Sequence, residues 1–440
     1  MKLTSFVAGI ALFLTTPAFA QDGQNNQPPK GFVALFNGTD LTGWRGGDTK
    51  DHRWLMNLPE AERTAQLQKW NDSLKAHWKV ENGELLNDGQ GAYATTEKEY
   101  GDFEMHVDFN TAPGGDSGIY LKGVPQVQIW DALAADPKDA RGIAKGSGGL
   151  WNNSPGAPGK DPLVLADKKP GQWNHLRILM IGARVSVWLN DKLTVDHATL
   201  ENYYDRKTPI PARGPIGLQT HGAPIRWRNI FVRELASDEA NQILAAHGTG
   251  GFAPIFNGKD LTGWAGPIDN YEVVDGTLVC KPGKGGTIYW NNELSDFVAR
   301  LEFKVPPGGN NGLAIRYSGE GDVAYGGMTE LQVLDDNYDK VKGKIDPRQA
   351  HGSAYGMAAA QRGYHRPNDQ WNFQEVTVKG STIKVELNGN IILDTDISKI
   401  DPATFMDNRP HPGKDRTSGF FGFAGHNDPV AFRNVQIKKF

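Results

Sequence analysis

An internal repeat constrains this chain more than any other feature. The run FVALFNGTDLTGW, which begins at Phe32, returns as FAPIFNGKDLTGW from Phe252. The similarity continues through GDFEMHVDFNTAPGGDSGIYLK from Gly101, which is matched by SDFVARLEFKVPPGGNNGLAIR from Ser295. A spacing of about 200 residues is far too long for a solenoid, whose repeats span roughly 20–50 residues. The sequence therefore predicts two tandem domains that arose by duplication.

The repeat also predicts the domain boundaries. The first domain is placed at residues 31–235 and the second at 252–440, with a linker at 236–251 that combines about two helical turns with the flexible run GTGG. Residues 52–77 have no counterpart in the second copy and carry helix formers with apolar residues three and four apart. We expect a helical insert that covers the first site, lies across the domain interface or decorates the sandwich, and the sequence leaves these three open.

Short alternating segments predict strands in both copies. Residues 103–109 (FEMHVDF) and 383–387 (IKVEL) alternate apolar and polar side chains, which is typical of half-buried strands. The 53 glycines and 26 prolines of the 440-residue chain supply many turns between them. We therefore predict an all-β protein in which each copy is an antiparallel sandwich of the jelly-roll type.

The first residues have the pattern of a secretory signal peptide. Lys2 supplies a positive charge, residues 6–14 an apolar core, and Ala18-Phe19-Ala20 a small-x-small cleavage site. We therefore predict a signal peptide at 1–20, a disordered leader at 21–30, and secretion, with the periplasm as the expected location. No apolar run in the mature part is long enough to span a bilayer.

Charge and cysteine content exclude several classes of protein. The chain has 47 Lys and Arg against 51 Asp and Glu, for a net charge of -4, so a nucleic-acid partner that binds a basic surface is not expected. The single Cys280 allows no intramolecular disulfide and no cysteine-based zinc site. Zinc-protease, phosphate-loop and serine-elbow motifs are also missing from the sequence.

Strand periodicity predicts which polar side chains share the outer face of one sheet. If Val127 and Ile129 face the core, the alternate residues of that strand point the other way. In the first copy these are Gln126, Gln128 and Trp130, and in the second Glu330 and Gln332. A solvated polar face would explain such residues equally well.

The same argument adds a cation and an imidazole to that face in each copy. Lys122 corresponds to Arg316, and His221 corresponds to His426. The shared histidine fits a function, although two copies of one ancestor also share structural residues. The predicted strand carries only one acid in the second copy, Glu330, so the usual two-carboxylate glycosidase mechanism is disfavoured.

Taken in order, the motifs resemble one family. FNGxDLTGW, the PGGxxG turn, xQxxD on a strand, a Trp-Asn pair and the closing FRNV-type strand are similar to the 3-keto-disaccharide hydrolase domain family, once catalogued as a domain of unknown function. The resemblance covers essentially all of both copies. It implies a concanavalin A-like jelly roll and an enzyme that acts on small carbohydrates, the 3-keto-glycosides.

The chemistry that this resemblance implies needs one base and no carboxylate pair. A ketone at C3 acidifies the proton at C2, so a base can remove it and the C1 aglycone leaves by β-elimination, after which water adds to the alkene. His426 or His221 suits the proton transfer, Arg316 or Lys122 the enolate oxygen, and Glu330 the second acid or base role. The resemblance also allows a divalent metal ion on the enolate, without a spacing that establishes one.

The resemblance ranks the two copies differently. In the second copy the expected site residues are Glu330, Gln332, Asp335, His351, Tyr355, His411 and His426. In the first copy Gln126 replaces the glutamate, and a carboxamide is no base, so we expect His221 to need Asp131 or Glu201 as its partner. Sugar-stacking aromatic side chains are expected at Trp130, Trp151 and Tyr203. The alternative to an enzyme is a non-catalytic, lectin-like carbohydrate-binding protein, because jelly rolls host both.

Overall fold

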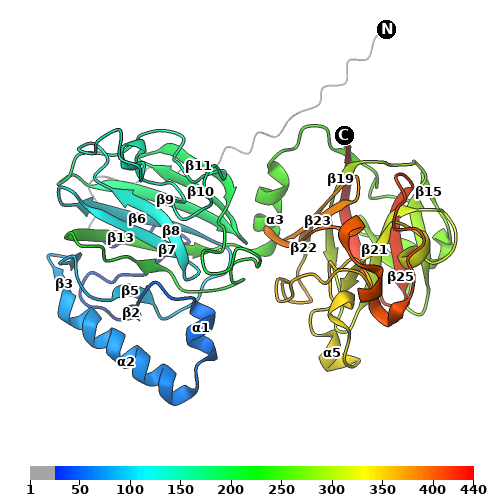
Figure 1. Ribbon diagram of the computed structural model, residues 1–440, viewed down its shortest axis with the longest axis horizontal. Helices are drawn as coiled ribbons and strands as arrows, with labels where there is room; N and C mark the ends of the chain where they lie inside the picture. The colour runs from blue at the N-terminus through cyan, green and yellow to red at the C-terminus, as the bar shows by residue number, and fades with distance from the viewer. Residues whose placement is uncertain (1–24) are drawn as a thin grey trace, which may run out of the picture.

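The computed structural model describes residues 25–440 and shows two β-sandwich lobes joined by a helix (Figure 1). The predicted signal peptide at residues 1–20 lies outside the described residues. The fold is mostly β, with four antiparallel sheets in two sandwich-like halves, which confirms the tandem jelly-roll architecture.

In the first domain an eight-stranded sheet packs on a five-stranded sheet. The large sheet has the order β11 (Lys192–Thr199), β10 (Arg184–Leu189), β9 (Asn174–Ile181), β6 (Phe103–Thr111), β13 (Ile225–Glu234), β4 (Glu84–Asn87) and β3 (Trp78–Glu81), and β1 (Val33–Ala34) pairs with β13. The small sheet has the order β2 (Trp44–Gly47), β5 (Tyr93–Thr96), β12 (Gly217–Leu218), β7 (Asp116–Leu121) and β8 (Val124–Trp130).

The second domain repeats this plan strand for strand. Its large sheet has the order β16 (Tyr271–Val274), β17 (Thr277–Cys280), β26 (Ala431–Lys439), β19 (Phe297–Lys304), β22 (Asn372–Lys379), β23 (Thr382–Leu387) and β24 (Asn390–Asp396), and β14 (Ala253–Pro254) pairs with β26. Its small sheet has the order β15 (Trp264–Ala265), β18 (Gly285–Trp290), β25 (Phe420–His426), β20 (Asn310–Tyr317) and β21 (Thr329–Leu334). Two short helices, α4 (Val323–Gly326) and α5 (Tyr338–Val341), flank β21.

The core of each domain lies between its two sheets. Val127 and Ile129 of β8 are fully buried there, as are Leu331 and Val333 of β21. Their burial places the alternate residues of both strands on the outer face of the small sheet, as the period of two predicts.

The insert found only in the first domain forms two helices, α1 (His52–Asn57) and α2 (Glu60–His77). Helix α2 lies against β2, where Gly46 approaches the Trp70 backbone so closely that a side chain at Gly46 would clash with it. The Gly46 amide also donates to the Asn71 side chain at 2.8 Å. The insert therefore lies over the β2 end of the first small sheet and borders the pocket there.

The described part of the leader is ordered, which corrects the expectation of disorder for residues 25–30. Asn26 is buried, its side chain donates to the Gly83 carbonyl at 2.7 Å, and its amide donates to the Asn229 side chain at 2.7 Å. Asn229 returns the bond, its own amide donating to Asn26 at 2.9 Å. These contacts tie the segment to the first domain.

The linker is a packed helix and not a free tether. Helix α3 (Ser237–Ala246) buries Ala240 and Leu244 against Ile181 of the first domain and Phe373 of the second. In Figure 1 this helix stands between the two lobes. The helical part expected of the linker is thus present as α3, which belongs to an apolar cluster to which both domains contribute.

Direct contacts also join the two domains. Arg184 on β10 pairs with Glu386 on β23, with Nε and Oε1 2.9 Å apart. Arg366 reaches back to Asp102 at 3.2 Å, and the Ala183 amide donates to the Gly389 carbonyl at 3.1 Å. The hydrogen-bonded hairpin turns of the two large sheets thus hold the domains in one relative orientation.

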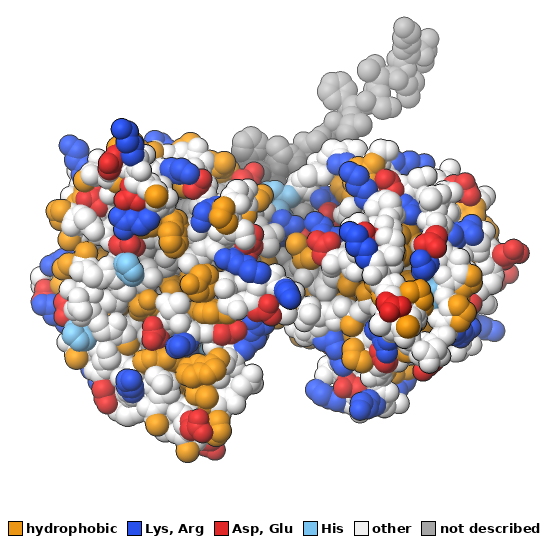
Figure 2. Space-filling view, viewed as in Figure 1, with side chains coloured by type: hydrophobic (Ala, Val, Ile, Leu, Met, Phe, Trp, Pro, Cys, Tyr) orange, Lys and Arg blue, Asp and Glu red, His pale blue; other side chains and the backbone are white. Residues whose placement is uncertain are grey.

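The surface carries both signs of charge. On the face shown in Figure 2, lysine and arginine side chains are interspersed with aspartate and glutamate on both lobes. Among the described residues, no helix has the length and apolar character needed to cross a membrane.

The apolar cluster around α3 predicts that the two domains unfold as a coupled unit. Replacing Leu244 with alanine removes buried contacts and is expected to cost about 2–5 kcal/mol. Scanning calorimetry should show a lower transition temperature or two separate transitions for this variant. The matched control is Gln242→Ala, an exposed position on the same helix. Equal unfolding profiles for the two variants would show that α3 does not couple the domains.

Candidate functional site

The outer face of the second small sheet carries a cavity of about 320 Å³. Its floor is formed by Glu330 and Gln332 of β21 and by His426 at the end of β25. Tyr325 of α4 and the loop residues Tyr355 and Arg409 form its walls. The structure therefore brings together the predicted carboxylate, amide and imidazole of the second copy.

A glutamate and a histidine meet across an intervening strand. Glu330 and His426 lie on β21 and β25, with β20 between them, and His426 Nε2 is 3.3 Å from Glu330 Oε1. Gly312 on β20 makes this crossing possible, because a Cβ at that position would overlap the Glu330 carboxylate. The last glycine of the repeated PGGxxG motif thus has a specific role, which is to let the Glu330 side chain lie flat across the sheet.

The pair places charge in a partly covered site. Glu330 is 4% exposed, whereas the His426 side chain keeps 46% of its surface exposed. The hydrogen bond that His426 donates to Glu330 raises the pKa of His426 above its usual value, and the nearby carboxylates of Asp322 and Asp428 act in the same direction. With Nε2 directed at Glu330, the Nδ1 atom is the one left to face a ligand.

The walls of the cavity are aromatic and cationic. The Arg409 guanidinium lies 3.5 Å from the centre of the Tyr325 ring, and Gln349 donates to the Tyr355 hydroxyl at 3.3 Å. His411 is buried behind this wall, where its Nδ1 is 2.8 Å from the Ala324 carbonyl. Tyr355 therefore faces the cavity as predicted, while His411 supports Tyr325 from behind.

The structure corrects the role predicted for Arg316. The ladder between β20 and β25 slips between Ala314 and Tyr317, and Arg316 takes a positive φ of 46°, so its side chain leaves the outer face. Arg316 is 2% exposed and donates to the Ser295, Gly380 and Arg416 carbonyls at 2.8–2.9 Å and to Asp296 at 2.8 Å. The cation of the cavity is Arg409 instead.

Lys122 shows the same departure in the first domain. It follows β7 with a φ of 53°, is fully buried and donates to the Gly182 carbonyl at 2.8 Å. Burial lowers the pKa of Lys122 to about 8. Gly182 occupies the same place in the repeat as Gly380, so in both copies a buried cation ties the small sheet to a hairpin of the large sheet. This role is structural and not catalytic.

Three further predicted residues have structural positions. His351 is 3% exposed, its Nε2 is 2.7 Å from Gln374, and burial lowers the pKa of His351 well below its usual value. Asp335 and Asp131 both accept a hydrogen bond at 2.8 Å from a glycine amide of the PGG turn, Gly308 and Gly114 respectively. These side chains brace the site from outside and do not line the cavity.

In the first domain the corresponding face holds a chain of polar contacts. Gln126 donates to Gln128 at 2.6 Å, and Gln128 donates to Asp116 at 2.8 Å. The other Asp116 oxygen lies 3.2 Å from Nδ1 of His221. The partner of His221 is therefore Asp116, and neither Asp131 nor Glu201.

Sequence reasoning missed Asp116, although the repeat contains the signal. Asp116 aligns with Asn310, and Gln126 aligns with Glu330, so an acid and an amide have exchanged places between neighbouring strands. Comparing the copies column by column would have shown the exchange. Tyr325, on the short helix α4, and Arg409, on a loop, carry no such signal.

The other residues predicted for the first-domain site, Trp130, Trp151, Glu201 and Tyr203, do not share one pocket. Trp130 is buried and Trp151 packs edge-on against it, with ring centres 5.8 Å apart. Glu201 accepts from the Ser154 hydroxyl at 2.6 Å at the groove between the domains. Tyr203 is exposed and packs edge-on against a neighbouring tyrosine ring. A sugar platform that joins Trp130 to Tyr203 is not present, because Trp130 is covered.

A divalent metal ion in this cavity would need the amide oxygens of Gln332 or Asn310 in addition to Glu330 and His426. Among residues 25–440, no three His, Cys, Asp or Glu side chains are grouped as a metal site requires. Glu330 and His426 contribute one carboxylate and one imidazole, and they contact each other.

The fold and the site define a class, which is a tandem β-sandwich protein with an imidazole–carboxylate pair in a sheet-face cavity. The model of the 3-keto-alpha-glucoside-1,2-lyase-like domain matches residues 31–233 and again residues 251–438. The chain belongs to this family and contains two copies of its domain.

Several relatives are similar to parts of this chain. The curated protein "3-keto-disaccharide hydrolase" of Bacteroides thetaiotaomicron is 26% identical over 47% of this chain and 85% of its own length. Among solved structures, a protein of Parabacteroides distasonis described as a proposed glycosyl hydrolase is 25% identical, with 44% of this chain and 95% of that chain covered and a TM-score of 0.38. Another from the same organism is 23% identical, with 53% and 100% covered and a TM-score of 0.35.

Removing the Glu330 charge should lower the pKa of His426. We expect this because the hydrogen bond that His426 donates to Glu330 favours the protonated imidazole, and in Glu330→Gln only burial, which favours the neutral ring, remains strong. An NMR titration of the histidine ring protons measures the change. Asp415→Asn, which removes an exposed carboxylate elsewhere, is the control and should leave His426 unaffected. An unchanged His426 pKa in Glu330→Gln would refute the pairing.

Arg316→Met should destabilise the protein without abolishing the function of the cavity. We expect a loss of about 3–5 kcal/mol in the free energy of unfolding, because three carbonyl oxygens and Asp296 lose their donor. Urea unfolding measures the loss, with the exposed Lys344→Met as control. Ligand binding or turnover per folded molecule should stay within about twofold, whereas a catalytic arginine would lose far more.

Proposed function

We propose that this protein cleaves 3-keto-glycosides and that the second domain contains an active site for the reaction. Membership in the 3-keto-alpha-glucoside-1,2-lyase-like family supports the substrate class. The single observation that supports the chemistry is the Glu330–His426 pair on the floor of a cavity of about 320 Å³. A pocket of roughly 300 Å³ or more is of the size that holds small organic ligands.

The proposed reaction begins at C2 of the keto sugar. His426 takes the C2 proton, and the electron pair passes into the C2–C3 bond while the C3 ketone becomes an enolate. Glu330 stabilises the imidazolium that forms, as a carboxylate beside a histidine base does. The ketone must lie toward a cation for this step to be fast, and Arg409 is the guanidinium on the cavity wall.

The second step breaks the C1 bond. The enolate re-forms the ketone, the C1–O bond breaks, and the aglycone oxygen takes a proton, so that an unsaturated keto sugar and the free aglycone result. The imidazolium of His426 holds the proton removed at C2 and can return it to the leaving oxygen. Addition of water to the alkene completes the net hydrolysis.

The pair sets the direction of the pH dependence. His426 acts as a base only when it is neutral, and Glu330 raises its pKa above the usual value. Activity should therefore rise with pH through the His426 pKa, and the midpoint should move to lower pH when Glu330 is replaced by glutamine. The midpoint moves to lower pH because loss of the carboxylate makes the protonated His426 ring less stable.

We also propose that the protein is exported to the periplasm. Residues 1–20 have a charged start, an apolar core and a small-x-small site, which support this location. Cell fractionation of the native chain and of a form that starts at Gln21 would test export, since only the native chain should reach the periplasm.

The active-site variants give a direct test. With a chromogenic 3-keto-glucoside, and with the first domain disabled by His221→Ala, His426→Ala should lower kcat by about 10²-fold or more, the lower range for loss of a general base. Glu330→Gln should lower kcat less, because the imidazole remains. The matched control is Lys399→Ala, an exposed position that does not line the cavity, and EDTA should not change these ratios.

Two outcomes would contradict the proposal. If the wild-type protein binds 3-keto-glucosides but releases no aglycone with or without added metal ions, the chain is a carbohydrate-binding protein. If His426→Ala turns over at the wild-type rate once the first domain is disabled by His221→Ala, the base is not His426.

A further inference from the structure

The outer face of the first small sheet carries a histidine–carboxylate pair, as the second does. Its carboxylate, however, comes from a different strand of the sheet. In the second domain the carboxylate is Glu330 on β21, and the aligned position on the neighbouring strand β20 is Asn310. In the first domain the carboxylate is Asp116 on β7, and the position aligned with Glu330 is Gln126 on β8. Each face thus has one acid beside its histidine, at 3.3 Å in one copy and 3.2 Å in the other.

The contacts of the first face fix the orientation of this pair. Asp116 accepts from Gln128 at 2.8 Å through Oδ1, which leaves Oδ2 to meet His221. Gln128 is held in turn by Gln126, and both glutamine side chains are buried. A neutral His221 with its proton on Nδ1, toward Asp116, presents the basic lone pair of Nε2 to solvent.

The exposure of the two residues suits a base and the group that orients it. The His221 side chain is 58% exposed, whereas the Asp116 side chain is 21% exposed. Burial raises the pKa of Asp116, and the His221 charge opposes that shift. The Gln126 Oε1 atom, which lies against Gly118, is buried without a hydrogen-bond partner among the described residues.

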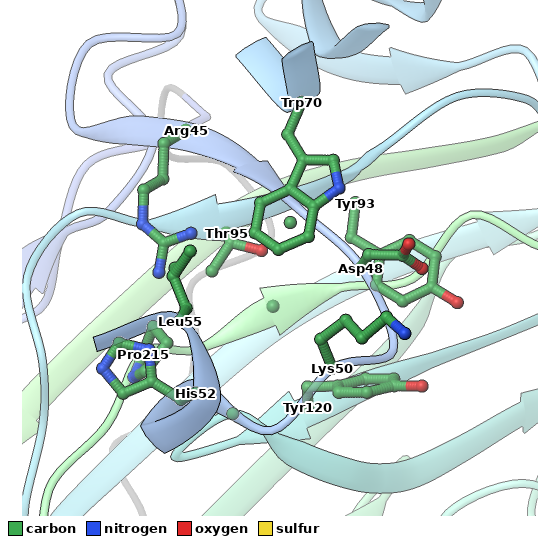
Figure 3. Close-up of a pocket in the computed structure, with 13 residues that line it drawn as sticks. Arg45, Asp48, Lys50, His52, Leu55, Trp70, Tyr93, Thr95, Tyr120 and Pro215 are labelled. Atoms are coloured by element: carbon green, nitrogen blue, oxygen red, sulfur yellow. The ribbon is translucent and has the colours of Figure 1, made fainter. Parts of the chain in front are cut away.

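The insert makes this face different from its counterpart. Under α1 and α2, the pocket lined by Arg45, Trp70 and Tyr120 has an accessible volume of only about 30 Å³, which is room for a few waters (Figure 3). Tyr120 lies on β7, two residues after Gly118 and on the same face of the sheet. The Gln126 side chain lies against Gly118. The covered end of the face cannot hold a sugar, so a substrate must approach from the Asp116 and His221 end.

We propose that the first domain contains a second catalytic site, in which Nε2 of His221 is the base and Asp116 positions it. This inference rests on the proposed function, and its substrate class is the same, a 3-keto-glycoside. Nε2 takes the C2 proton, the C1–O bond breaks, and the aglycone oxygen leaves with the electron pair and takes a proton. The products are the same as in the second domain, namely an unsaturated keto sugar and the free aglycone. Water then adds to the alkene, as it does there.

A first experiment isolates the first site by disabling the second. His426→Ala in the full-length protein should retain activity above background, and the added change His221→Ala should reduce that remainder at least about tenfold. Within the His426→Ala protein, Asp116→Asn should lower kcat with little change in KM, and Asp116→Glu should recover part of the loss. Asp136→Asn, an exposed carboxylate on a nearby loop, is the matched control.

A second experiment moves the charge within the second domain. An acid at position 310 on β20 should orient His426 as Asp116 on β7 orients His221. The double variant Glu330→Gln with Asn310→Asp should therefore regain at least about tenfold in kcat over Glu330→Gln alone. Asn310→Asp alone is the control for the added charge. Failure of the double variant to recover, together with no residual activity in His426→Ala, would overturn the inference.

The two proposals fail in different ways. If the wild-type protein releases no aglycone, the proposed function is wrong. If the wild-type protein is active but His426→Ala falls to background, and Asp116→Asn leaves wild-type turnover unchanged, the proposed function stands and the second site does not exist.

Discussion

One close contact governs the site of each domain, namely a long polar side chain that lies across a glycine of the next strand. Glu330 crosses Gly312 to reach His426, and Gln126 lies over Gly118 at the aligned position. Any Cβ at either glycine would overlap that side chain, so the polar groups could not lie flat on the sheet. The cavity floor therefore depends on backbone packing before it depends on chemistry.

Buried cations then fix the sheet that carries this contact. Arg316 and Lys122 hold hairpin carbonyls of the opposite sheet in their own domains, at Gly380 and Gly182. Gly182 also lies at the turn that meets the second domain, next to the hydrogen bond from Ala183 to Gly389. In the first domain, the turn at Gly182 thus links the small sheet, the large sheet and the neighbouring domain. Each copy buries one such cation, Lys122 in the first and Arg316 in the second.

The sequence predicted what depends on strand period and on the repeat. It placed Glu330, Gln332 and His426 on one face, because alternation holds along uninterrupted strands. It failed for Arg316 because a bulge with positive φ reverses the face, and the sequence carries no local sign of that bulge. Loop residues such as Arg409 were beyond reach, since their position depends on tertiary packing.

Duplication explains how the two faces diverge while the fold stays the same. Exchanging an acid and an amide between adjacent strands keeps one carboxylate beside the histidine, so neither copy buries a second, repelling charge. The insert leaves only a pocket of about 30 Å³ at one end of the first face, whereas the second face keeps a cavity of about 320 Å³. Sheet order is common to both copies, so differences in what they accept must come from the charge position and from the cover.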